Sequence, residues 1–161
     1  MRVSARRVVA VAGGTTGIGR AIAELFLSRR YAVAVGARSV RDPALPAGVV
    51  HGLLDVRHRG DVRRFVGMVR RRFGRLDVFV NCAGASGWRV LGAIRQCVAR
   101  EMLETGVLGT LWGCAAAAEM MGRDGCIVNV SSLAGKRGSA NNSVYCASKF
   151  AVVGLTESLR V

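Results

Sequence analysis

Residues 8–20 read VVAVAGGTTGIGR, an apolar run that passes directly into a cluster of glycines. The run Val8–Val11 has the length and β-branched composition of a buried strand, and a helical pattern follows from Ile18 to Ser28. Glycines at such a junction let backbone N–H groups approach an anion, which the positive end of the helix dipole attracts. The pattern predicts a turn that binds the pyrophosphate of a dinucleotide. A purely structural turn is the alternative, because the spacing is G-x-x-x-G-x-G and not G-x-G-x-x-G.

The rest of the chain alternates between short apolar runs and helical patterns. Strands are predicted at Val8–Val11, Tyr31–Val35, Val49–Leu54, Val78–Val80 and Ile127–Val130. Helices are predicted at Ile18–Ser28, Asp61–Phe73, Val98–Met121 and Val144–Leu159. Apolar strands separated by helices indicate a parallel sheet covered on both faces, and right-handed crossovers favour a doubly wound α/β fold of the Rossmann type. The length of 161 residues fits one domain, residues 1–161.

The formal net charge of +14 comes almost entirely from arginine. A basic surface attracts anions, so nucleic acid and phosphate-bearing cofactors are both possible partners. Several arginines alternate with apolar residues at helical spacing and are expected on the solvated face of a helix: Arg63, Arg64, Arg70 and Arg71. No aromatic-rich surface accompanies them, so a nucleic-acid-binding module ranks last among the possible functions and no specific nucleic-acid partner is expected.

The cysteines are odd in number and scattered, at positions 82, 97, 114, 126 and 146. No pair has the spacing of metal ligands, so no metal site is predicted, and free thiols are typical of a reducing compartment. No apolar stretch is long enough to cross a bilayer. We therefore expect a cytoplasmic protein without a membrane partner.

The second predicted strand leads into Gly36-Ala37-Arg38-Ser39, which contains no acid. NAD-specific sites usually place an acid here for the ribose 2′-hydroxyl, whereas an arginine can pair with a 2′-phosphate. The sequence therefore predicts NADP(H) in preference to NAD(H), with Arg38 on the phosphate and a further hydroxyl from Ser39. The alternative is that Arg38 is one more arginine in an arginine-rich chain.

Tyr145 and Lys149 stand four residues apart in the last helical pattern and so share a helix face. A neighbouring ammonium stabilises a phenolate and lowers the pKa of a tyrosine from its usual value of about 10, which makes the phenol a usable acid or base. Ser131 and Ser132 follow the strand Ile127–Val130, where parallel sheets place their ligands. These residues predict proton transfer to or from a substrate oxygen.

Together these motifs resemble the short-chain dehydrogenase/reductase family, of the compact type that includes acyl-carrier-protein ketoreductases and carbonyl reductases. The matching segments are the glycine turn Gly13–Gly19, the pair Asp55-Val56, the segment Asn81-Cys82-Ala83-Gly84, and Ser132, Tyr145 and Lys149. Ala12 stands where the family usually has Thr, and Cys82 where it has a second Asn.

The resemblance implies an oxidoreductase that transfers a hydride between NADP(H) and a small carbonyl or secondary-alcohol substrate. It implies that Tyr145 exchanges the proton, that Ser132 positions the substrate oxygen, and that Lys149 binds the nicotinamide ribose. The expected cofactor contacts are Gly13, Thr15, Thr16, Gly17, Ile18, Gly19, Arg38, Ser39, Asp55, Val56, Asn81, Ala83, Gly84, Tyr145 and Lys149.

Two departures from the family pattern carry further expectations. Gly106 stands where the family has an Asn that supports a water relay, so we expect a slower relay. The sequence stops at Val161, within the helix of Tyr145 and Lys149, so the last strands of the family fold are expected to be missing and the chain to self-associate. A catalytically weak or inactive remnant that keeps only the dinucleotide half is therefore the second hypothesis.

Overall fold

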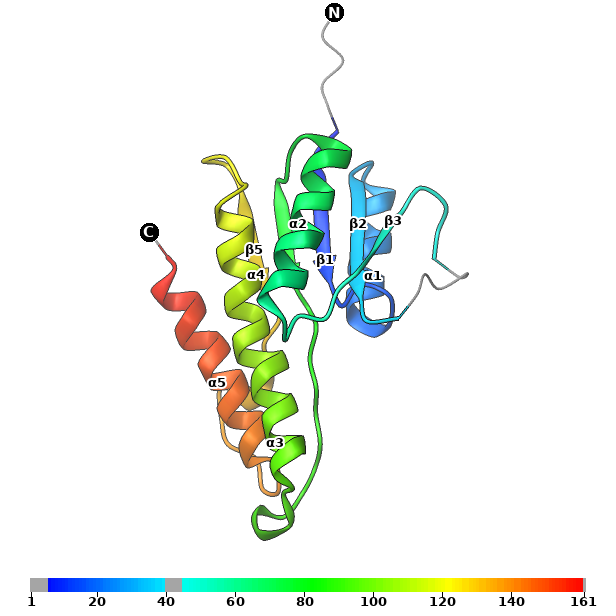
Figure 1. Cartoon of the computed structure of the whole chain (residues 1–161). Helices are drawn as coiled ribbons and strands as arrows, with labels where there is room; N and C mark the ends of the chain where they lie inside the picture. The colour runs from blue at the N-terminus through cyan, green and yellow to red at the C-terminus, as the bar shows by residue number, and fades with distance from the viewer. Residues whose placement is uncertain (1–5, 40–44, 161) are drawn as a thin grey trace, which may run out of the picture.

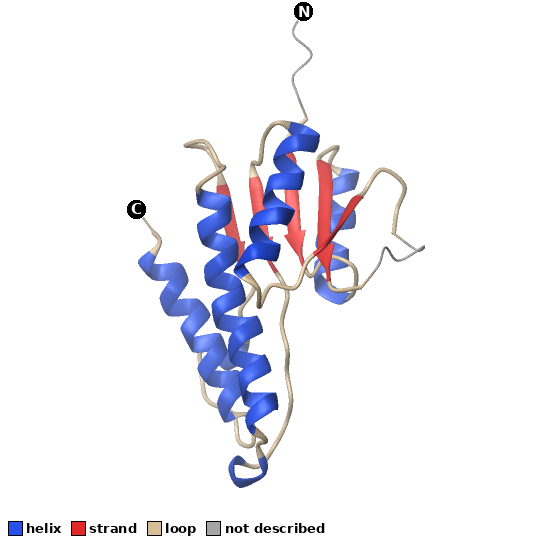
Figure 2. Ribbon diagram, in the orientation of Figure 1, coloured by secondary structure: helices blue, strands red, loops and turns tan. Residues whose placement is uncertain are grey.

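The computed structural model describes residues 6–39 and 45–160, so both ends of the predicted domain lie outside the described residues. Five parallel strands form one sheet with helices on both faces (Figures 1 and 2). The strands are β1 (Val8–Ala12), β2 (Ala32–Ala37), β3 (Val50–Leu53), β4 (Val78–Asn81) and β5 (Cys126–Asn129), in the order β3-β2-β1-β4-β5. The predicted doubly wound α/β fold is confirmed.

The helices are α1 (Gly17–Ser28), α2 (Arg59–Phe73), α3 (Gln96–Leu103), α4 (Gly109–Ala118) and α5 (Ser143–Ser158), with the short turns η1 (Leu91–Ala93) and η3 (Leu133–Gly135). The single helix predicted over Val98–Met121 is instead α3 and α4 joined by a π-helical turn, η2 (Glu104–Leu108). A π turn holds more residues than an α turn and so rotates the side chains that follow it.

The strand β1 supplies side chains to two separate cores. Val9 and Val11 pack in the cluster that contains Ala23 of α1. Val8 and Ala10 pack on the other face, in the cluster that contains Phe65 of α2. Because both faces are covered, the strand is apolar at every position, and this is why the run was recognisable in the sequence.

The sheet reverses its strand order around β1. The chain moves outward from β1 through β2 to β3 and then returns to place β4 on the opposite side of β1. The loops that follow β1 and β4 therefore diverge and leave a crevice at the carboxyl ends of the strands. Ligands of open α/β sheets bind at this kind of switch point.

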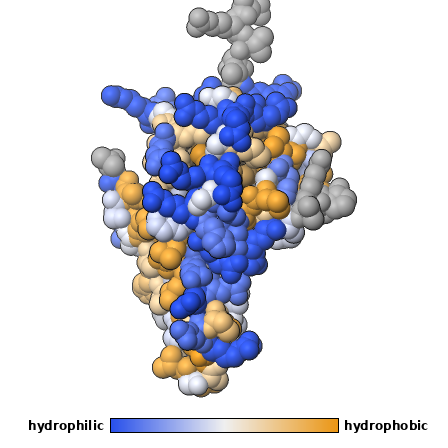
Figure 3. All heavy atoms as spheres, in the orientation of Figure 1, coloured by the Kyte–Doolittle hydropathy of each residue, from blue (hydrophilic) through white to orange (hydrophobic). Residues whose placement is uncertain are grey.

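The helix α2 is amphipathic, as predicted. Val62, Phe65 and Val69 are buried, while the arginines between them are exposed. Hydrophilic side chains gather over this helix in the space-filling view (Figure 3). None of the helices in the described part of the chain is both long and apolar enough to cross a membrane.

Asp77 joins the beginnings of β1 and β4. Its carboxylate accepts a hydrogen bond from the Val8 N–H at 2.7 Å and from Arg75 Nε at 2.9 Å. Burial alone would raise the pKa of Asp77, but the hydrogen bonds from Arg75 and Val8 outweigh it and hold the pKa below 3.8. The ionised carboxylate therefore stabilises the folded state.

We expect Asp77→Asn to lower the free energy of unfolding by about 1.5–3 kcal/mol at pH 7, the range for hydrogen bonds to a charged group. The folded pKa is the lower one, so this stabilisation is complete above pH 3.8 and is lost as the pH falls through the folded pKa. Urea unfolding at pH 7 and pH 3 should show the difference from wild type shrinking in acid. Asp124→Asn, in an exposed loop, is the control. A difference that does not depend on pH would contradict this account.

Candidate active site

A groove of about 740 Å³ lies at the carboxyl ends of the strands. Residues that follow each of the five strands line it, from the glycine turn after β1 to Val130 and Ser131 after β5. The predicted site residues that line the groove are Gly13, Thr15, Thr16, Ile18, Gly19, Arg38, Ser39, Asp55, Val56, Ala83, Gly84, Tyr145 and Lys149. The fold thus brings residues from widely separated parts of the sequence together around one opening.

The glycine turn is packed too tightly for side chains. Gly13 has a φ of +78°, and a Cβ there would lie 2.7 Å from the Ala83 backbone nitrogen. A Cβ at Gly19 would overlap the carbonyl oxygen of Gly13. Bare backbone therefore faces the groove at the beginning of α1, whose first turn contains no acidic residue. This end of the groove is suited to a phosphate group.

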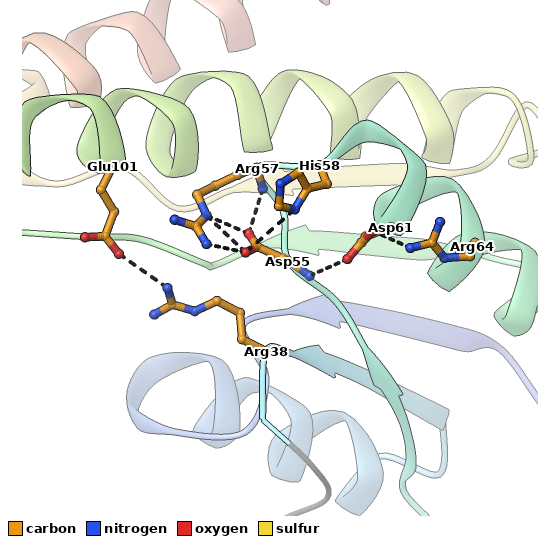
Figure 4. Close-up of polar contacts among 7 residues, drawn as sticks. All are labelled: Arg38, Asp55, Arg57, His58, Asp61, Arg64 and Glu101. Carbon is orange, nitrogen blue, oxygen red and sulfur yellow. Dashed lines mark hydrogen bonds and ion pairs between the residues drawn. The ribbon is translucent and has the colours of Figure 1, made fainter. Parts of the chain in front are cut away.

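The rim of the groove beyond the glycine turn is charged (Figure 4). Arg38, after β2, reaches across to Glu101 of α3, with 3.3 Å between Nη1 and Oε1. Arg57 donates from Nε to both carboxylate oxygens of Asp55, at 2.9 and 3.0 Å. This hydrogen bonding from Arg57 lowers the pKa of Asp55, so the carboxylate is ionised at neutral pH.

Tyr145 and Lys149 lie at the opposite end of the groove. Lys149 is only 8% exposed, and its Nζ lies 5.7 Å from the centroid of the Tyr145 ring. The Nζ donates to the carbonyl oxygen of Val130 at 2.9 Å, which ties the ammonium to the end of β5. Burial lowers the pKa of Lys149 below 10.5. The two side chains therefore share one face of α5.

A second hollow of about 530 Å³ adjoins Tyr145 on its other side. Ser132 and Trp88 line it, and Tyr145 lines both this hollow and the groove. Asn142 also lines it and is 6% exposed; within the described residues its Oδ1 has no hydrogen-bond partner. Tyr145 thus stands where a molecule in the hollow would meet one in the groove.

Comparisons with known proteins agree with this fold. A family model described as short chain dehydrogenase matches residues 7–161. The chain belongs to the short-chain dehydrogenase/reductase family. The 3-oxoacyl-(acyl-carrier-protein) reductase of Bos taurus is 35% identical over 160 residues, which cover 95% of this chain and 68% of the relative. Members of this family are NAD(P)-dependent oxidoreductases.

Solved structures of the short-chain dehydrogenase/reductase family share the fold. The ligand-free aldohexose dehydrogenase of Thermoplasma acidophilum has a TM-score of 0.88 at 32% identity. The match covers 96% of this chain and 60% of the aldohexose dehydrogenase, so the chain spans less than two thirds of that protein. The alcohol dehydrogenase of Thermococcus sibiricus, complexed with 5-hydroxy-NADP, has a TM-score of 0.88 at 28% identity and is 69% covered, against 95% of this chain.

Three of the predicted residues lie outside the groove of this short-chain dehydrogenase/reductase. Gly17 begins α1 with a φ of +54° and is not among the lining residues. Asn81 is buried behind the groove, where its Nδ2 donates to Asn129 Oδ1 at 2.8 Å and so joins β4 to β5. Ser132 lines the second hollow, while its neighbour Ser131 lines the groove. Successive side chains after a strand point to opposite sides, which explains the division between the two serines.

Several groove residues were not predicted. Glu101 and Thr105 come from the helical column that includes α3 and η2, and Cys82 comes from the loop after β4. Cys82 belongs to the segment Asn81-Cys82-Ala83-Gly84, whose neighbouring residues were predicted to contact the cofactor. Glu101 is 63 residues from Arg38, and no local pattern connects them.

Gly106 occupies the π-helical turn and is buried. A Cβ added there would lie 3.4 Å from the Cβ and Oγ atoms of Ser148, whereas Thr105 faces the groove. The slowed relay at Gly106 stays a prediction. The described residues contain no group of three His, Cys, Asp or Glu side chains that could hold a metal ion.

Proposed function

We propose that this chain binds NADP(H) and transfers a hydride between it and a small carbonyl or secondary-alcohol substrate. The observation that carries the proposal is that one groove contains a glycine turn and Arg38 at one end and the Tyr145–Lys149 pair at the other. The 3-oxoacyl-(acyl-carrier-protein) reductase and alcohol dehydrogenase names of the relatives are consistent with carbonyl–alcohol chemistry.

The residues present fit a dinucleotide along the whole groove. Gly13 and Gly19 let the turn pack closely, because a Cβ at either position would collide with neighbouring backbone, and the closed turn presents its backbone to a pyrophosphate in the groove. Asp55 and Val56 line the wall where an adenine would lie, and Arg38 stands near the place for a 2′-phosphate. A bound nicotinamide supplies or accepts the hydride.

In this proposal Tyr145 exchanges the proton. Its position between the groove and the second hollow lets its hydroxyl reach a substrate oxygen beside the cofactor. During reduction the phenol donates its proton to the carbonyl oxygen, and during oxidation the phenolate accepts the proton of the alcohol. Ser132 Oγ already accepts from the Ala134 N–H at 3.2 Å, so its own proton is available to a substrate oxygen in the hollow.

Lys149 has two roles in the same proposal. One of its three N–H donors is used by Val130, which leaves two for a ribose hydroxyl in the groove. Its buried position beside the Tyr145 ring also means that its positive charge is weakly screened and stabilises a phenolate there. The proton transfer and the cofactor site therefore share this side chain.

We expect titrations at low salt to give a smaller Kd for NADPH than for NADH, by about tenfold or more. The reason is that an arginine–phosphate contact is a charge-assisted hydrogen bond worth roughly 1.5–3 kcal/mol, and each 1.4 kcal/mol is tenfold in Kd. Quenching of cofactor fluorescence or calorimetry measures both constants on the same preparation. If NADH bound as tightly as NADPH, the assignment of Arg38 to the 2′-phosphate would be wrong.

We also propose a cytoplasmic location and self-association. All five cysteines, which lie within the described residues, are free thiols, as a reducing compartment favours. β5 forms one edge of the described sheet, and Val128 of β5 and Phe150 of α5 are exposed apolar side chains. Sedimentation of a stable monomer at micromolar concentration would contradict self-association.

A further inference from the structure

The contact between Arg38 and Glu101 crosses the mouth of the groove. Arg38 follows β2 and Glu101 belongs to α3, and both line the groove. Their side chains are 64% and 43% exposed, so solvent and ligands reach both of them. Figure 4 shows the two pointing toward one another across the opening. The guanidinium proposed to hold a 2′-phosphate thus already faces a carboxylate of this chain.

The other carboxylate on this rim is engaged elsewhere. Asp55 is bound by Arg57, whose Nε reaches both of its oxygens, and it does not share in the contact with Arg38. Glu104, one helical turn along from Glu101, approaches Arg100 at 4.0 Å. Among the described residues, Arg38 therefore forms its ion pair with Glu101.

We infer that Glu101 is a specificity-determining residue for the cofactor, because it competes with the 2′-phosphate for Arg38. The inference rests on the proposed NADP(H) binding. A ligand that carries the phosphate has either to displace the carboxylate or to lie beside it. If the phosphate displaces the carboxylate, the ion pair is lost, and if it lies beside the carboxylate, the two negative charges repel each other. Both effects weaken the binding of the phosphorylated cofactor. NADH has a ribose hydroxyl at this position, which leaves the ion pair intact.

The consequence is a moderated cofactor preference. Arg38 favours the phosphorylated cofactor, and Glu101 reduces that advantage without affecting the unphosphorylated one. Exposed ion pairs are weak, so the reduction is on the order of two- to fivefold in Kd. Glu101 of α3 thereby changes the preference between NADP(H) and NAD(H), which is usually attributed to the residues after β2 alone.

The test is a double-mutant cycle with Glu101→Gln, Arg38→Ala and the double variant, each titrated with NADPH, NADH and 2′,5′-ADP. Glu101→Gln should lower the Kd for NADPH and for 2′,5′-ADP by roughly two- to fivefold and leave that for NADH unchanged. In the Arg38→Ala background the same substitution should have a clearly smaller effect. Glu119→Gln, at the far end of α4 and exposed, removes the same charge away from the groove and should change none of the constants.

The outcomes separate this inference from the proposed function. If Arg38→Ala weakens NADPH binding but Glu101→Gln leaves it unchanged or weakens it, the competition is wrong and the cofactor proposal stands. An equal gain with and without Arg38 would also overturn the competition. If Arg38→Ala leaves the ratio of the NADPH and NADH constants unchanged, the 2′-phosphate assignment and the inference both fail.

Discussion

Replacing Tyr145 with Phe is expected to lower NADPH-dependent reduction of ketones by a factor on the order of 10²–10⁴, the usual contribution of a positioned acid or base. The substitution removes one hydroxyl and keeps the ring beside Lys149, 5.7 Å from its Nζ. Cofactor affinity should therefore change by no more than about tenfold, since the ring is retained and at most one hydrogen bond is lost. Steady-state rates with a panel of ketones and fluorescence titration of NADPH measure the two effects separately.

Tyr31→Phe is the matched control, because Tyr31 is the other tyrosine of the chain and lies just before β2, at the amino end of the sheet. It should leave turnover unchanged. Tyr145→Phe with more than a tenth of wild-type turnover would exclude Tyr145 as the proton-transfer group. A wild-type chain that binds NADPH but turns over none of the ketones would instead favour the inactive remnant.

Gly19→Ala is expected to weaken NADPH binding by about 100-fold or more. The added Cβ would overlap the carbonyl oxygen of Gly13, so the turn has to open and its N–H groups move away from the pyrophosphate. Two or three lost hydrogen bonds to a charged group, each worth about 1.5–3 kcal/mol, give this magnitude. Titration of NADPH measures the loss, and circular dichroism checks that the sheet still forms.

Gly67→Ala is the matched control, because it makes the same substitution in a helix away from the groove. Gly67 lies in the middle of α2, and among the described side chains a Cβ there would come near only Arg71 Nη1, at 3.5 Å. Alanine is a better helix former than glycine, so this variant should gain up to about 1 kcal/mol of stability and keep its cofactor affinity. If Gly19→Ala bound NADPH as the wild type does, the tight turn would not be the pyrophosphate site.

Much of the fold was predictable because the central strands of the sheet are covered on both faces. That burial makes β1 apolar at every position, and the five apolar runs in the sequence correspond to the five strands. The amphipathic helix α2 was also predictable, because Val62, Phe65 and Val69 alternate with arginines at helical spacing. The π-helical turn over Glu104–Leu108 was not, because an apolar periodicity does not distinguish one extra residue in a turn from a continuous α-helix.

The site was predictable where its residues lie close together in the sequence. The glycine turn and the Tyr145–Lys149 pair are local patterns, and the structure places them in one groove. The position of Asn81 behind that groove depends on which face of β4 the side chain takes, and a motif match does not specify it. The partner of Arg38 depends on the packing of α3 against the loop after β2, so Glu101 was visible only in three dimensions.

The bond between Lys149 Nζ and the carbonyl oxygen of Val130 links the proposed chemistry to the margin of the sheet. Val130 immediately follows β5, the outermost strand on that side of the described sheet. Marginal strands open at lower free energy than central ones, so local fraying there releases the ammonium while the interior persists. Whatever protects this border from opening, whether a further part of a longer chain or a second subunit, also governs how long the ammonium stays in place.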